Sequence, residues 1–109
     1  MLRMFIDTRR NGIERLSFAP PYDWLIAFVT LEVGTDLRNA RFWTETVRKA
    51  AAGETTRDVS GSTFVLDADA TTTELESPDR KIWRVPTPIL LEALERWLKH
   101  LEQSGIGRG

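Results

Sequence analysis

The chain has 109 residues, a formal net charge of −1 and no cysteine. This length fits one domain that can bury a core without disulfides or metal, and the near-neutral charge excludes a general attraction to DNA or membranes. The chain has no glycine-rich phosphate loop and no serine nucleophile motif, and its one histidine, His100, is expected on a helix surface. Most catalysis at neutral pH needs such groups, so we expect a non-enzymatic protein with no cofactor and no metal.

The first seven residues contain no long apolar run and carry an acidic residue, which is not typical of a signal peptide. The longest apolar stretch, residues 24–29, is far shorter than the roughly 20 residues of a membrane span. The absence of cysteine fits a reducing compartment, so we expect a cytoplasmic protein. One α+β domain is expected over residues 1–104, followed by a flexible tail at 105–109.

Residues 2–18 predict a β-hairpin. An Asn-Gly dipeptide favours a two-residue loop, but that register would turn the apolar residues of the two strands to opposite faces. A three-residue loop over 10–12, with Gly12 in the left-handed region, brings Ile6 opposite Leu16 instead. We therefore expect the three-residue loop.

Residues 22–33 predict a third strand. The run 24–29 is apolar at odd and even positions alike, as in a central strand that is covered on both faces. Its β-branched residues favour the same interpretation. A short helix that is capped by Asp23 and ended by Gly34 is the alternative.

A helix is expected from Asp36 as N-cap to about residue 52, followed by a surface loop over 54–60. Three short strands are expected at 63–67, 71–76 and 81–85, and the threonine-rich middle one is interpreted as an edge that could pair two copies of the chain as a homodimer. A final helix is expected from Thr87. The order β-β-β-α-β-β-β-α predicts an α+β fold with an antiparallel-rich sheet of about six strands and two helices.

Five acidic residues follow one another without an intervening base: Asp67, Asp69, Glu74, Glu76 and Asp79. Acids two residues apart share one strand face, which could serve hydrolysis or hold a divalent cation. A solvated face or a charged edge that resists aggregation is the structural alternative. A calcium loop would need a glycine that this segment lacks. We interpret the segment as an acidic surface for a basic protein partner.

Trp83 and Arg84 are added to this partner surface, because exposed tryptophan beside arginine is typical of interface hot spots. Trp24 is the other tryptophan that we expect to be partly exposed. Trp43 and Trp97 fall on the apolar stripes of the two helices and are expected in the core.

The N-terminal segment supplies a second candidate site, because Arg3, Arg9, Arg10 and Arg15 cluster there. These arginines could contact phosphates, with Phe5 as a stacking surface for a base. The missing basic excess argues against this hypothesis. It is retained as the alternative function, a small nucleic-acid-binding accessory protein.

The layout as a whole resembles the small cytoplasmic immunity proteins of bacterial polymorphic toxin systems. It shares an N-terminal hairpin, an apolar segment, a helix with the pair Phe42-Trp43, a three-strand meander and a closing Leu/Trp helix. The resemblance covers the chain in outline and includes no signature motif. It implies a protein that neutralises a toxin by masking it and assigns no residue. An immunity or antitoxin-type inhibitor is thus the first hypothesis, nucleic-acid binding the second and a carboxylate-based hydrolase the third.

Overall fold

The computed structural model describes residues 2–8 and 14–104, so the predicted hairpin loop and tail lie outside the described residues. It shows an α+β fold with two antiparallel sheets of two and four strands. The elements in chain order are β1 (Met4–Thr8), β2 (Glu14–Phe18), α1 (Leu25–Ala27), η1 (Phe28–Val33), α2 (Leu37–Ala51), β3 (Thr56–Ser60), β4 (Val65–Ala68), β5 (Thr72–Glu76), β6 (Ile82–Pro86) and α3 (Thr87–Ser104).

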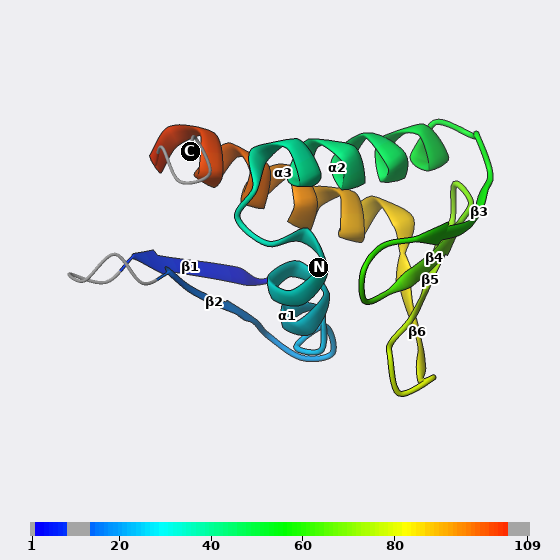
Figure 1. The fold of residues 1–109 in the computed structure, drawn as a ribbon, viewed down its shortest axis with the longest axis horizontal. Helices are drawn as coiled ribbons and strands as arrows, with labels where there is room; N and C mark the ends of the chain where they lie inside the picture. The colour runs from blue at the N-terminus through cyan, green and yellow to red at the C-terminus, as the bar shows by residue number, and fades with distance from the viewer. Residues whose placement is uncertain (1, 9–13, 105–109) are drawn as a thin grey trace.

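The two sheets lie toward opposite ends of the molecule (Figure 1). Helices α2 and α3 run side by side, with the β1–β2 hairpin toward one end and the four-stranded sheet toward the other. The larger sheet has the order β3-β4-β5-β6. The predicted single sheet of about six strands is therefore wrong, and three helical segments replace the two that were expected.

The hairpin has the register that the three-residue loop predicts. Ile6 lies opposite Leu16 and Met4 opposite Phe18, so the apolar side chains of both strands share one face. Arg96 of α3 donates a hydrogen bond of 3.2 Å to the Met4 carbonyl oxygen. This hydrogen bond connects the hairpin to the closing helix.

The predicted third strand is wrong, because α1 and the π-helix η1 occupy that segment. Its fully buried residues Leu25, Phe28, Val29 and Val33 recur at helical spacing. An apolar run can satisfy both a buried strand and a buried helix, and here the helix docks these residues against the core. The helix ends at Gly34, whose φ of 67° is costly for other residues.

Two strand assignments also need correction. The segment predicted as a loop over 54–60 contains the edge strand β3. This strand pairs with β4 through backbone hydrogen bonds, and its polar side chains do not show the pattern expected of a strand. The threonine-rich strand β5 is not an edge, since it pairs with β4 and β6. Thr73 is fully buried, and its hydroxyl lies 2.9 Å from that of Thr87. The basis for a homodimer through β5 is therefore lost.

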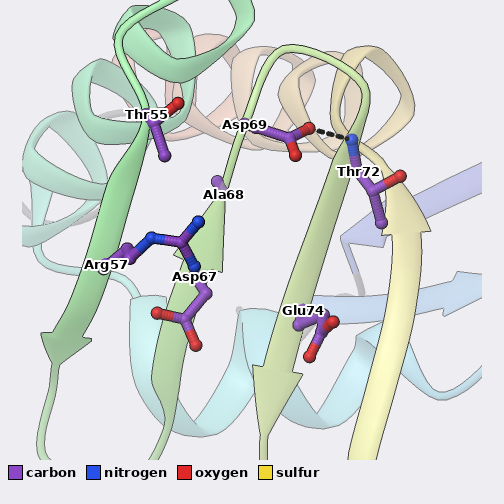
Figure 2. A pocket seen from close by; sticks show the side chains of 7 residues that line it. All are labelled: Thr55, Arg57, Asp67, Ala68, Asp69, Thr72 and Glu74. Carbon is purple, nitrogen blue, oxygen red and sulfur yellow. Dashed lines mark hydrogen bonds between the residues drawn. The ribbon is translucent and has the colours of Figure 1, made fainter.

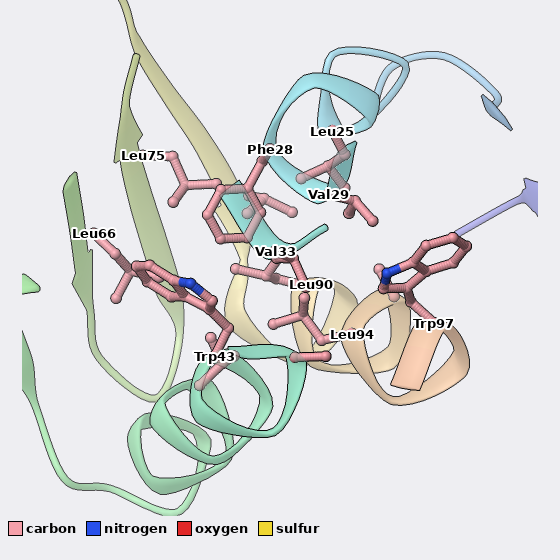
Figure 3. Packing of buried hydrophobic residues seen from close by; sticks show 14 of the residues in the cluster. Leu25, Phe28, Val29, Val33, Trp43, Leu66, Leu75, Leu90, Leu94 and Trp97 are labelled. Carbon is pink, nitrogen blue, oxygen red and sulfur yellow. The ribbon is translucent and has the colours of Figure 1, made fainter. Parts of the chain in front are cut away.

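The core lies between the helices and the inner face of the larger sheet (Figure 3). Phe28 stands at its centre and makes edge-to-face contacts with Trp43 and Phe64, each with ring centroids 5.4 Å apart. Trp97 of α3 packs beside η1, and its indole nitrogen donates a 2.8 Å hydrogen bond to the Gly34 carbonyl oxygen. The core positions predicted for Trp43 and Trp97 are confirmed.

Candidate functional site

All helices pack on one side of the four-stranded sheet and leave its other side open (Figure 2). The strand period turns Leu66, Leu75 and Val85 inward to the core. The alternate residues point outward and form what we call the outer face: Arg57, Asp67, Glu74, Glu76, Ile82 and Arg84. An uncovered sheet face in a small domain is where a partner could bind.

Charged residues of three strands lie in register across the outer face. Asp67 on β4 is opposite Glu74 on β5, which in turn is opposite Arg84 on β6. Glu74 pairs with Arg84 at 3.2 Å, and the Arg84 side chain is 70% exposed. Exposed pairs of this kind stabilise a fold by less than about 1 kcal/mol. Their charges therefore remain accessible to a partner.

Asp67 has a structural contact within the sheet. Its carboxylate accepts a 2.7 Å hydrogen bond from the backbone N–H of Asp58. Asp58 has a φ of 54° and lies where the β3–β4 register shifts. The Arg57 guanidinium extends toward Asp67 from β3 (Figure 2). Asp67 therefore supports the β-bulge in addition to its place on the outer face.

Asp69 holds the turn that leads from β4 into β5. Its carboxylate accepts hydrogen bonds of 2.8 Å from the backbone N–H groups of Thr72 and Thr71. These two bonds, with Thr72 first, lower the pKa of Asp69 below its ordinary value. Asp69 thus stays ionised and adds a negative charge beside the outer face.

We expect the Asp69 carboxyl to titrate below the usual aspartate value of about 3.9. Because its pKa is lowered in the folded state, its contribution to stability is present above the ordinary value and is lost as the pH falls through the folded pKa. A 13C NMR titration of the aspartate carboxyl groups measures the midpoint directly. A midpoint at or above the ordinary value would contradict the two backbone hydrogen bonds.

The remaining predicted acids separate from this cluster. Glu76 lies at the far end of β5, between Val65 and Ile82. Asp79 belongs to the β5–β6 turn, where it accepts a hydrogen bond from the Ser77 hydroxyl, and this bond lowers its pKa. Asp69 and Asp79 therefore lie at opposite ends of β5, and the five acids do not form one patch.

Trp83 and Arg84 point to opposite sides of β6. Trp83 is half-buried and stacks on Trp24 with ring centroids 5.2 Å apart and an interplanar angle of 17°. The partial exposure expected for these two tryptophans is confirmed. A partner on the outer face would contact Arg84 and its exposed neighbour Ile82 instead of Trp83.

A shallow hollow of about 80 Å³ lies on the outer face. Its charged lining residues are Arg57, Asp67, Asp69 and Glu74. Small-molecule sites usually measure roughly 300–1,000 Å³, so the hollow is too small for most substrates. His100 is not among its lining residues and stacks on Trp97 at 5.5 Å. No group of three or more acids or histidines in the described part of the chain is arranged to hold a metal ion.

The structure describes only part of the predicted arginine cluster. Arg9 and Arg10 lie outside the described residues, and Arg15 pairs with Asp7 in the backbone register. Arg3 is exposed, as is Phe5 at 58%. The alternation of the strand places these two on the same face of the hairpin.

The sequence analysis missed Glu32, which is buried on η1 with 5% exposure. Its carboxylate accepts hydrogen bonds from the backbone N–H groups of Ser62, Thr63 and Phe64 at 3.1, 2.8 and 2.6 Å. A lone acid within an apolar run was the signal, since buried charges need partners. Glu32 connects η1 to the β3–β4 loop and is a structural residue. Ile82 was also missed, although it lies two residues before Arg84 and therefore on the same face of the strand.

Comparisons with protein-family models, with curated proteins and with solved structures find no match. In the described residues, no helix has the length and apolar character needed to cross a membrane.

Proposed function

We propose that this chain is a non-enzymatic protein-binding domain that contacts a basic partner protein through the outer face. An immunity or antitoxin-type inhibitor that masks its partner is the specific form that we favour. The observation that supports this proposal is the uncovered side of the four-stranded sheet, which carries an excess of carboxylates and, on its edge strand β6, an exposed apolar residue.

The charges of the outer face favour a basic partner. Asp67 and Glu74, with the neighbouring Asp69, place three carboxylates near the guanidiniums of Arg57 and Arg84, and Glu76 adds a fourth at the far end of β5. An acidic surface of this kind accelerates encounter with a basic protein.

Ile82 supplies the apolar contact, since its side chain is 55% exposed. Interfaces typically place such an anchor inside a charged rim that excludes water. The outer face thus has both components of a docking surface.

Two observations favour binding over carboxylate-based hydrolysis. The hollow that brings the acids together has a volume of only about 80 Å³. The carboxylates of Asp67 and Asp69 already accept backbone hydrogen bonds, and the pKa of Asp69 is lowered, whereas a general acid needs a raised pKa. These acids are better suited to holding turns and presenting charge.

We expect charge reversal on the outer face to weaken partner binding. The double variant Glu74→Lys/Glu76→Lys should weaken binding at least about tenfold, because both charges then repel a basic surface. The partner is first identified by co-purification from the source cells or by co-expression with the product of the neighbouring gene. Its affinity is then measured by isothermal titration calorimetry at two salt concentrations.

The matched control is Glu54→Lys/Glu92→Lys, which changes the net charge equally at exposed positions away from the outer face. This control should bind like the unaltered protein, with circular dichroism showing that both variants are folded. Equal weakening by both pairs would show that only net charge matters and would sink the proposed docking face. A partner with an acidic surface would do the same.

A second candidate function is supported by the hairpin, where exposed Arg3 and Phe5 share one face. Cation and aromatic together suit a single-stranded nucleic acid. Gel shifts separate the two candidates, because nucleic-acid binding that persists at about 150 mM salt would favour this one.

A further inference from the structure

A second surface lies on the other side of β3, where residues of α2 and β3 line a groove of about 470 Å³. Its volume falls within the range of roughly 300–1,000 Å³ that is typical of ligand sites. Helix α2 contributes Arg38, Arg41, Phe42 and Lys49, and β3 contributes Thr56 and Val59. The groove is distinct from the hollow on the outer face, with which it shares no residue.

The groove is positively charged. Arg38, Arg41 and Lys49 follow one side of α2, and all three are exposed. The one acid in the lining, Glu45, forms an ion pair with Arg48. Arg41 reaches Glu102 at 3.4 Å, with both side chains largely in solvent. Such exposed pairs exchange readily for a partner's carboxylate, because they are worth little in water.

An apolar surface lies among these cations. The Phe42 side chain is 51% exposed and contacts Trp43 edge-to-face at 5.3 Å. Val59 is partly buried against the core from the opposite wall. A large exposed aromatic ring within a charged groove is typical of an anchor for a partner side chain.

We propose that this groove binds an acidic polypeptide segment that carries an apolar side chain between its carboxylates. Arginine suits this ligand because its planar guanidinium pairs with a carboxylate through two hydrogen bonds. Phe42 and Val59 would contact the apolar side chain. A nucleic acid fits less well, since sequence-tolerant strand binding uses a series of aromatic rings and the groove has one. The protein would then have two docking surfaces of opposite charge.

The test uses a fluorescein-labelled peptide of the sequence Gly-Glu-Glu-Leu-Glu-Phe-Asp-Glu-Gly and measures its anisotropy against the full chain. A peptide with Gln and Asn in place of the acids has the same apolar content and should bind at least about tenfold more weakly. Arg38→Glu and Lys49→Glu should each weaken the acidic peptide about tenfold, and Phe42→Ala by a similar factor.

Lys99→Glu is the matched control for Lys49→Glu, because it reverses an exposed lysine on α3 outside the groove. It should leave the affinity unchanged, as should Glu74→Lys/Glu76→Lys on the outer face, which separates this site from the proposed function. No binding at millimolar peptide would overturn the proposal. So would tighter binding of a single-stranded oligonucleotide, or a dimer in light scattering that the groove variants dissociate.

Discussion

Glu32→Ala should lower the free energy of unfolding by about 3 kcal/mol, because three backbone N–H groups lose a charged acceptor in a buried setting. Glu32 is 5% exposed, and its carboxylate connects segments about thirty residues apart in sequence. Urea unfolding followed by tryptophan fluorescence measures the change. Glu32→Gln should lose part of this stability, since the amide keeps one acceptor oxygen.

Glu54→Ala is the control for this prediction, because it removes an exposed carboxylate and should change stability by less than about 0.5 kcal/mol. The loop supplies an independent check through Gly61. A Cβ atom at this position would overlap the Glu32 carboxylate, so Gly61→Ala should cost about 2 kcal/mol.

The Gly61→Ala cost should disappear in the Glu32→Ala background, where the carboxylate is gone. The double-mutant cycle therefore expects a coupling of about 2 kcal/mol. Additive effects of the two substitutions, or a Glu32→Ala effect no larger than that of Glu54→Ala, would contradict the proposed role of Glu32 in connecting η1 to the β3–β4 loop.

Phe28→Ala should cost about 4 kcal/mol, because it removes a fully buried ring from the centre of the core. The loss includes the edge-to-face contacts with Trp43 and Phe64. The midpoint of urea unfolding measures this cost, provided that the slope of the transition is unchanged. A smaller slope or two transitions would instead indicate that η1 has separated from the sheet.

Phe42→Ala is the comparison for Phe28→Ala, since it removes the same ring from the next helix at a half-exposed position. It should cost less than about 1 kcal/mol. Equal costs for the two phenylalanines would contradict the central position of Phe28.

The sequence predicted an element correctly where its pattern of apolar residues was compatible with only one secondary structure or register. The register of Ile6 opposite Leu16 followed from keeping the apolar residues on one face. The α2 and α3 helices began where Asp36 and Thr87 were predicted to start them. Asp67 and Glu74, both predicted on strands, lie opposite each other on neighbouring strands of the larger sheet.

Where an apolar run is compatible with both a strand and a helix, the sequence alone could not decide between them. Residues 24–33 are apolar enough for a central strand, and only the docking of Leu25 and Phe28 against the core selects the helix. Strand β3 forms through backbone pairing that its polar side chains do not reveal. The outer face was predicted only in part. Trp83 and Arg84 were assigned to one surface because they are adjacent in sequence, although adjacent residues of a strand point to opposite faces.

The loops of the larger sheet differ in how freely they can be altered. The β3–β4 loop surrounds the Glu32 carboxylate, and the β4–β5 turn is tied to α3 through the Thr87 hydroxyl, which donates to the Asp69 carbonyl oxygen. In the turn from Ser77 to Lys81, the hydrogen bonds join residues of the turn to one another, and the turn projects into solvent. A fluorescent reporter or affinity tag is therefore best inserted there, where added residues leave the cross-links of the domain intact.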